Sequence, residues 1–149
     1  MSIAIASDHG GFELKEEIKK FLLEKGEELL DLGTNTDTAV DYPEYGMKVA
    51  EKVSRGEVEK GILICGTGIG MSIVANKFSG IRAALVTNEF MARMAKEHNN
   101  ANILVLGGRV TDCDKSCRLV EIWLSTKFAG ERHQRRLDKI KDVETKLGG

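Results

Sequence analysis

Five short apolar runs alternate with longer amphipathic stretches, and this alternation constrains the fold more than any other feature of the sequence. Strands that are buried on both faces are near-continuous apolar runs, and helices that connect such strands place them parallel in one sheet. Right-handed crossovers then predict a doubly wound, Rossmann-like five-stranded parallel sheet between two layers of helices, a three-layer α/β/α fold. The expected strands are Ser2–Ala6, Glu28–Gly33, Lys60–Cys65, Arg82–Val86 and Asn102–Gly107.

The stretches between the strands have the spacing of helices. Leu14, Ile18, Phe21 and Leu22 recur on one helical face with Lys and Glu between them, so this helix is expected to end near Gly26. The one proline of the chain, at position 43, stands where a helix can begin. The other expected helices cover residues 44–54, 70–78, 88–98, 112 to about 125, and about 131 to 147.

Length and composition limit the class of protein. A chain of 149 residues is close to one ordinary domain, so residues 1–149 are expected to form a single domain. Apolar residues make up 42% of the chain, which is enough for a core, and no run of about 18 apolar residues could span a membrane. A net charge of −1 argues against general affinity for nucleic acid or for anionic membranes.

The cysteines and the N-terminal segment indicate a cytoplasmic protein. Three cysteines, an odd number without the spacing of a disulfide framework, are typical of a reducing compartment. The first residues, MSIAIASDHGG, lack a basic region followed by a long apolar stretch, so no secretory signal is predicted.

Polar residues and glycines follow the expected strands directly. Doubly wound sheets bind ligands outside the carboxyl ends of their strands, at the point where the strand order reverses. The residues just after each strand are therefore the candidates for a binding site. They are Ser7–Gly10 after the first strand, Cys65–Gly68 after the third, Thr87 and Asn88 after the fourth, and Gly108 and Arg109 after the fifth.

The sequence GTGIG, residues 66–70, stands at the start of an expected helix. Glycines let backbone amides approach a ligand closely, and a helix N-terminus favours negative charge. A P-loop would need Lys followed by Ser or Thr, where this chain has Met71 and Ser72, and a dinucleotide fingerprint has a different glycine spacing after the first strand. Both nucleotide interpretations are therefore weak, whereas a cradle for another anion and a tight turn without a ligand stay open.

Cys65 ends the third strand at the mouth of this turn. Amide groups at a helix start favour the thiolate, and a thiolate beside amide donors can take a proton from carbon while the amides hold the resulting oxyanion. A buried cysteine is otherwise a small apolar residue, and position alone does not decide between these roles. Cys113 and Cys117 lie four residues apart on an expected helix without further metal ligands nearby, so we interpret them as structural.

Other polar side chains have two interpretations each. Asp8 and His9 either cap a turn or orient a substrate hydroxyl and contact a phosphate. His98 is followed by two asparagines, which suggests a polar pocket, although a lone surface histidine is usually idle. Arg132 and Arg136 lie four apart on one helix face, where they either grip a phosphate or form a solvated basic face.

Five segments carry a specific pattern when taken in order: SDHGGFELK, DYP, GILICGTGIGMSIVANKFSGIRAA, EHNNANILVLGGR and RHQRR. On these motifs the chain resembles the type B ribose-5-phosphate isomerases, whose family also includes galactose-6-phosphate isomerase subunits. The resemblance spans essentially the whole chain. Cys65 and Met71 are similar to the cysteine branch of that family, since another branch has serine and glutamate at these two positions.

The resemblance implies an enzyme that interconverts D-ribose 5-phosphate and D-ribulose 5-phosphate through a cis-enediolate, without metal or cofactor. It implies that Cys65 is the base, that Thr67 belongs to the catalytic turn and that His98 opens the furanose ring. It also implies a homodimer, or a tetramer, with sites shared between subunits and a C-terminal helix packed on the partner. The substrate-binding residues that it implies are Asp8, His9, Tyr42, Gly66, Gly68, Ile69, Gly70, Asn99, Arg109, Arg132 and Arg136.

Two other functions compete with this interpretation. One is an isomerase of a six-carbon aldose phosphate, such as allose 6-phosphate or galactose 6-phosphate, because pocket length is not visible in the sequence. The other is a non-catalytic sugar-phosphate sensor or phosphoacceptor module. A phosphoacceptor would have an aspartate at the end of the third strand, where this chain has Cys65.

Overall fold

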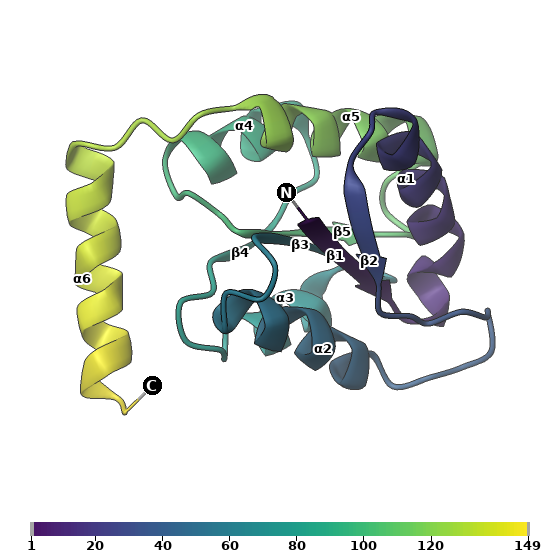
Figure 1. The fold of residues 1–149 in the computed structure, drawn as a ribbon, viewed down its shortest axis with the longest axis horizontal. Helices are drawn as coiled ribbons and strands as arrows, with labels where there is room; N and C mark the ends of the chain where they lie inside the picture. The colour runs from purple at the N-terminus through teal and green to yellow at the C-terminus, as the bar shows by residue number, and fades with distance from the viewer. Residues whose placement is uncertain (1, 149) are drawn as a thin grey trace.

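A computed structural model describes residues 2–148, and all five expected strands are present in it. They form one parallel sheet with the order β2-β1-β3-β5-β4 (Figure 1). The predicted parallel sheet is therefore confirmed. The strands are β1 (Ser2–Ser7), β2 (Glu28–Asp31), β3 (Lys60–Cys65), β4 (Ala83–Leu85) and β5 (Ile103–Gly107).

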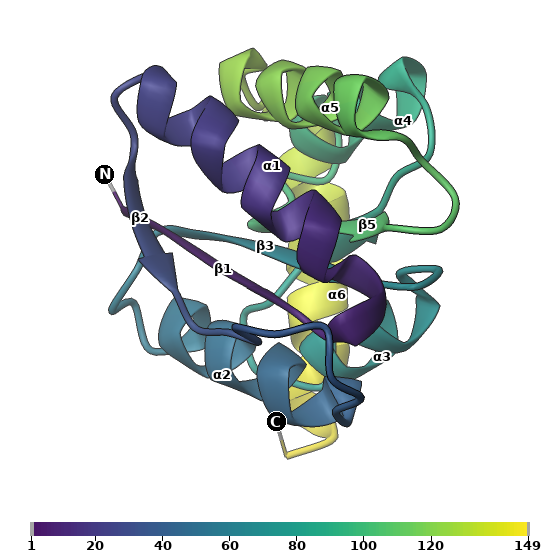
Figure 2. The ribbon, with the colours of Figure 1, turned by 90° about the vertical axis from the view of Figure 1, so that its right-hand side faces the viewer.

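Helices cover both faces of the sheet, which confirms the three-layer prediction. One face is covered by α1 (Phe12–Glu24), α4 (Glu89–Glu97) and α5 (Cys113–Ser125), and the other by α2 (Tyr42–Ser54) and α3 (Ile69–Ala75) (Figure 2). A short 3-10 turn, η1 (His9–Gly11), connects β1 to α1.

The sheet separates two apolar cores, and alternate residues of each strand contribute to each. On β1, Ile3 and Ile5 pack toward α1, α4 and α5, while Ala4 and Ala6 pack toward α2 and α3. Because both faces are buried, consecutive residues of a strand are all apolar. This is why the central strands are continuous apolar runs in the sequence.

The strand order reverses between β1 and β3. The chain leaves β1 for β2 on one side and later returns to β3 on the other side of β1. The connections therefore diverge above the carboxyl ends of these two strands, which is where such sheets bind ligands. Asp8 follows β1 there, and Cys65 ends β3.

Helix α3 ends at Ala75, three residues before its predicted end, and the side chain of Asn76 accounts for this boundary. Its amide nitrogen donates to the carbonyl oxygens of Ser72 and Ala83, each at 3.0 Å, and its oxygen accepts from the Ala83 amide at 2.9 Å. Asn76 therefore ends the helix and joins it to β4.

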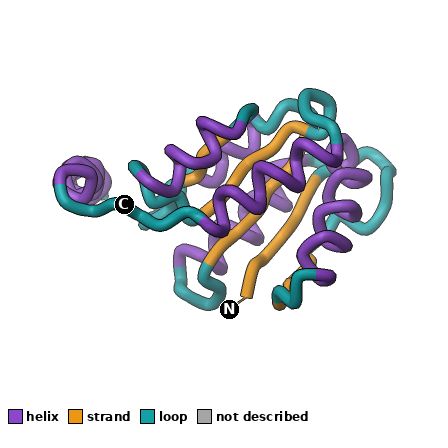
Figure 3. Tube along the Cα trace, turned by 90° about the horizontal axis from the view of Figure 1, so that it is seen from above, coloured by secondary structure: helices purple, strands orange, loops and turns teal. Residues whose placement is uncertain are grey.

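Helix α6 (Arg132–Lys146) stands apart from the three layers (Figures 1 and 3). Its later turns contact the rest of the chain where Glu144 accepts a hydrogen bond from the Gly80 amide at 2.7 Å. Ile140 and Val143 are 57% and 55% exposed on this helix. The described part of the chain thus leaves apolar residues of α6 uncovered.

Candidate active site

Cys65 is the last residue of β3 and is only 5% exposed. Its Sγ accepts a hydrogen bond from the backbone amide of Gly68 at 3.2 Å. The sulfur therefore packs against the apolar core on one side and contacts the glycine turn on the other. This is the local arrangement that a thiolate base beside oxyanion donors requires.

The glycine turn fits closely into its surroundings. Gly68 has a φ of +84°, and a Cβ there would lie 2.5 Å from Leu85 and 3.1 Å from the backbone of Leu106. A Cβ on Gly107 would lie 2.7 Å from the carbonyl group of Thr67. The Ile69 amide donates to the hydroxyl of Thr67 at 3.2 Å. The amides of Gly70 and Met71, which follow it at the start of α3, have no intrahelical acceptors.

Asp8 and His9 are fixed beside this turn. Asp8 caps η1, where its Oδ1 accepts from the Gly11 amide at 3.1 Å, so the capping interpretation holds for one of its oxygens. The Nδ1 atom of His9 accepts from the Val40 amide at 3.1 Å. In a neutral imidazole the proton then lies on Nε2, which makes Nε2 a donor.

Tyr42 and Arg109 complete the group of residues around Cys65. A Cβ on Gly70 would lie 2.4 and 2.5 Å from ring carbons of Tyr42 and 2.8 Å from its hydroxyl oxygen, so the phenol lies against the glycine turn. The Arg109 amide donates to the carbonyl of Gly66 at 2.9 Å, and its guanidinium lies beside the same glycine. We call this set the thiol cluster: Asp8, His9, Tyr42, Cys65–Gly70 and Arg109.

His98 and Asn99 lie on the opposite side of the sheet from Cys65, at the amino ends of the strands. They follow α4 and lead to Asn102, whose carbonyl accepts from the Gly61 amide at the amino end of β3. Cys65 is at the carboxyl end of the same strand. At about 3.3 Å per strand residue, the amino and carboxyl ends of β3 are on the order of 15 Å apart. One chain therefore does not bring His98 and Cys65 together.

The start of α6 joins His98 rather than Cys65. The rings of His98 and His133 are stacked, with centroids 4.1 Å apart and planes at 14°. Burial, and then the nearby charges of His98, Arg132 and Arg136, lower the pKa of His133. We call this set the histidine cluster: His98, Asn99, Arg132, His133 and Arg136.

His133 was not among the residues that the motifs predicted. It is the third histidine of the chain, and the other two, His9 and His98, were predicted as site residues. The signal that could have identified it is its place between two arginines that share one helix face.

Among residues 2–148, no group of three or more His, Cys, Asp and Glu side chains has a geometry that could hold a metal ion. No helix in the same range is both long enough and apolar enough to cross a membrane.

Comparison with known proteins points to one family. The family model of the ribose/galactose isomerases matches residues 3–140. Ribose-5-phosphate isomerase B of Escherichia coli is 45% identical over 142 residues, which cover 95% of each protein. A solved ribose-5-phosphate isomerase B from Clostridium thermocellum is 54% identical with a TM-score of 0.97, covering 99% of both chains.

A second solved structure carries a ligand. Ribose-5-phosphate isomerase B from Mycoplasma genitalium, solved with bound ribulose-5-phosphate, is 44% identical with a TM-score of 0.93 and covers 97% of this chain and 96% of its own. The fold, the switch-point thiol and these matches agree with one another. The chain therefore belongs to the ribose/galactose isomerase family.

Proposed function

We propose that this protein is a ribose-5-phosphate isomerase, which interconverts D-ribose 5-phosphate and D-ribulose 5-phosphate. The observation that supports this most directly is the hydrogen bond between the Gly68 amide and the sulfur of Cys65, at the carboxyl edge between β1 and β3. The relatives named above are ribose-5-phosphate isomerases, and one was solved with the ketose product.

In the proposed reaction, the thiolate of Cys65 takes the proton from C2 of the open-chain aldose. The electron pair of that bond forms the C1–C2 double bond, and O1 becomes the negatively charged enediolate oxygen. The amides of Gly70 and Met71 at the start of α3, which have no intrahelical acceptors, hold this charge, with Thr67 in the same turn. The thiol then returns the proton to C1 and O2 becomes the ketone oxygen, with a second proton moving from O2 to O1.

The rest of the site is proposed to come from a second copy of the chain. Within one chain the two clusters lie at opposite ends of the strands, so a sugar bound beside Cys65 is out of reach of the His98 in the same chain. In a homodimer, the partner would supply its own histidine cluster for ring opening and phosphate binding. Uncovered apolar residues on α6, such as Ile140 and Val143, fit a helix that packs on this partner.

The thiol cluster is proposed to hold the sugar. Asp8 and His9 contact substrate hydroxyls, Tyr42 packs on the sugar, and Arg109 contributes positive charge beside Gly66. Ile69 lines the turn at the start of α3. We also propose that residues 1–149 act as one domain and that the protein works in the cytoplasm without a metal or cofactor.

A coupled assay of ribulose 5-phosphate formation tests this function. We expect turnover of ribose 5-phosphate that a metal chelator does not reduce. Parallel measurements with allose 6-phosphate and galactose 6-phosphate should give lower kcat/KM values, because the named relatives act on the five-carbon sugar. A protein that binds the pentose phosphate without converting it would contradict the enzyme proposal, and a higher kcat/KM on a six-carbon substrate would contradict the substrate.

A further inference from the structure

Lys15 is a charged residue that the fold buries completely. The helical spacing of α1 places its apolar residues at other positions, yet the side chain of Lys15 is 0% exposed. Its ammonium lies 2.7 and 2.9 Å from the two carboxylate oxygens of Asp31, the last residue of β2. It also donates to Glu16 at 3.0 Å. A buried lysine of this kind joins α1 to the end of an edge strand.

All the hydrogen-bonding capacity of the Asp31 carboxylate is in use. Oδ1 accepts from Lys15 and from the Gly33 amide, each at 2.9 Å, and Oδ2 accepts from Lys15 and Lys19, each at 2.7 Å. An ionised carboxylate offers about four acceptor positions. Burial opposes ionisation of Asp31, but hydrogen bonds from the two lysines and the Gly33 amide outweigh it, so the pKa of this carboxyl lies below its usual value.

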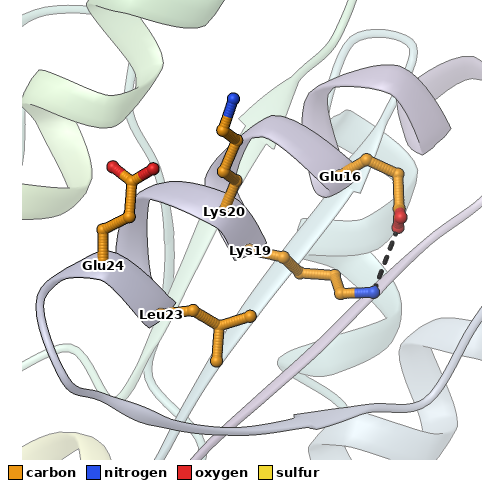
Figure 4. A pocket seen from close by; sticks show the side chains of 5 residues that line it. All are labelled: Glu16, Lys19, Lys20, Leu23 and Glu24. Carbon is orange, nitrogen blue, oxygen red and sulfur yellow. Dashed lines mark hydrogen bonds and ion pairs between the residues drawn. The ribbon is translucent and has the colours of Figure 1, made fainter.

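Lys19 is the outer partner of the same carboxylate. Figure 4 shows its ammonium beside Glu16, at a hollow of about 480 Å³ on the outer surface of α1 that is lined by Glu16, Lys19, Lys20, Leu23 and Glu24. Lys15 is thus the inner partner and Lys19 the partly exposed one. These two partners can be removed separately.

Stability alone is a weak reason for a buried ion pair. Removing two charges from water costs several kcal/mol per ion, and apolar residues of similar volume often give equal stability. What an apolar pair could not do is accept the hydrogen bond of the Gly33 amide. The pair therefore fixes the direction of the backbone as it leaves β2.

That backbone leads directly to the thiol cluster. The carbonyl of Gly33 accepts from the Ser7 amide at 2.7 Å, and the Thr34 amide donates to the Ser7 carbonyl at 2.8 Å, one residue before Asp8. At the far end of the connection between β2 and α2, the Val40 amide donates to the His9 ring, and Tyr42 follows against Gly70. The connection is thus anchored at both ends beside proposed substrate-binding residues.

We propose that Lys15 and Asp31 are positioning residues, which fix the start of the segment 32–41 and thereby place Tyr42 and His9 against the substrate. This inference rests on the proposed function of the thiol cluster. Neither residue touches the sugar. Their loss is expected to raise KM much more than it lowers kcat, because Cys65 on β3 keeps its own contact with Gly68.

The test compares the double variant Lys15→Met/Asp31→Leu, which removes both charges and the acceptor of the Gly33 amide, with the wild type. We expect KM for ribose 5-phosphate to rise about ten- to a hundredfold, with kcat within about threefold, since small misplacements of binding groups have effects of this size. Amide exchange at Thr34 and Val40 should become faster. Lys25→Met is the matched control, because it breaks an exposed ion pair of 3.0 Å with Glu121 at the end of the same helix and should leave KM unchanged.

A folded double variant with unchanged KM, or with a lower kcat at unchanged KM, overturns the proposal. Should the double variant not fold, Lys15→Met decides, because Asp31 keeps Lys19 as an ionic partner in that variant. A rise in KM of about threefold or more with faster exchange at Thr34 supports the proposal, and no change in either overturns it. A wild-type protein that does not isomerise ribose 5-phosphate would instead overturn the proposed function. The amide exchange would still test the anchoring.

Discussion

The thiol cluster and the histidine cluster are built by different means. In the thiol cluster the backbone sets the positions: the Gly68 amide donates to the sulfur of Cys65, and the Arg109 amide donates to the Gly66 carbonyl. In the histidine cluster the positions are set by side chains at helix ends, where the His98 ring stacks on His133. The first is fixed within one chain, whereas the second stands beside a helix whose apolar residues are uncovered.

This difference matches the tasks that we propose for the clusters. Proton transfer requires groups that are held within fractions of an ångström before the substrate arrives, and close-packed backbone provides this. Phosphate binding is served by long cationic side chains that a docking partner can bring to the substrate. The comparison therefore predicts that changes in the thiol cluster act on kcat and that changes in the histidine cluster act through the partner.

The largest effect is expected from Cys65→Ala. Loss of a general base lowers kcat by about 100- to 10,000-fold. The measurement is steady-state isomerisation of ribose 5-phosphate, with Cys113→Ala and Cys117→Ala as controls for the other two thiols. Both controls should retain wild-type kcat, because these residues lie on α5 and outside both clusters. Wild-type turnover by Cys65→Ala would remove the thiol from the mechanism.

Mixed dimers test whether the two clusters act across a subunit boundary. Cys65→Ala and Arg132→Met/Arg136→Met should each show little activity at substrate concentrations below KM. Random assortment of the two variants makes half of the dimers mixed, and each mixed dimer has one intact site of two, so about one quarter of the wild-type activity should return. No recovery after co-expression, with mixed dimers confirmed by mass, would place both clusters in the site of a single chain.

The sequence predicted the elements of this fold well because their signals are local. The expected strand over residues 60–65 is β3 without any change of boundary, and continuous apolar runs identify strands that are covered on both faces. Strand order is not a local property, because it depends on the side of the sheet to which each crossover leads. The separation of His98 from Cys65 instead follows from the parallel sheet itself, since each helix of such a sheet returns the chain to the amino ends of the strands, whereas Cys65 ends a strand. The family resemblance, rather than the spacing of residues, gave the expectation of a shared site.

The positions that the sequence did not reveal are those set by tertiary contacts. Lys15 has the sequence environment of a solvated helix residue, and its burial depends on Asp31, sixteen positions later. The place of His133 in the histidine cluster likewise depends on the stacking of its ring on His98. For both residues the decisive partner lies on another element, so a single sequence gives no periodic signal for it.

Gly68→Ala tests the rigidity of the thiol cluster with a smaller expected effect. The added methyl group would collide with Leu85 at 2.5 Å, and it would have to sit at a φ of +84°, so the turn must shift away from the sulfur. We expect kcat to fall about ten- to a hundredfold. Gly56→Ala is the matched control, because its φ of +74° carries the same strain while nothing lies within 4 Å of the new Cβ. Gly56→Ala should lose about 1–2 kcal/mol of stability and keep a normal kcat. Equal kcat in the Gly68→Ala and Gly56→Ala variants would show that catalysis does not need the present shape of the glycine turn.

The smallest effect is expected from acid on the histidine cluster. Burial and the charges of His98, Arg132 and Arg136 lower the pKa of His133 below its ordinary value of 6.5, with Glu97 opposing them. A histidine whose pKa is lowered by folding favours the native state when it is neutral. Its contribution is therefore complete above pH 6.5 and is lost as the pH falls through the lowered value.

We expect the melting temperature to fall slightly over this range, and His133→Phe, which keeps an aromatic ring against His98, should reduce that fall. If both proteins lose the same stability between pH 7 and pH 5, another group causes the acid sensitivity, and the stack does not hold α6 by way of a neutral His133.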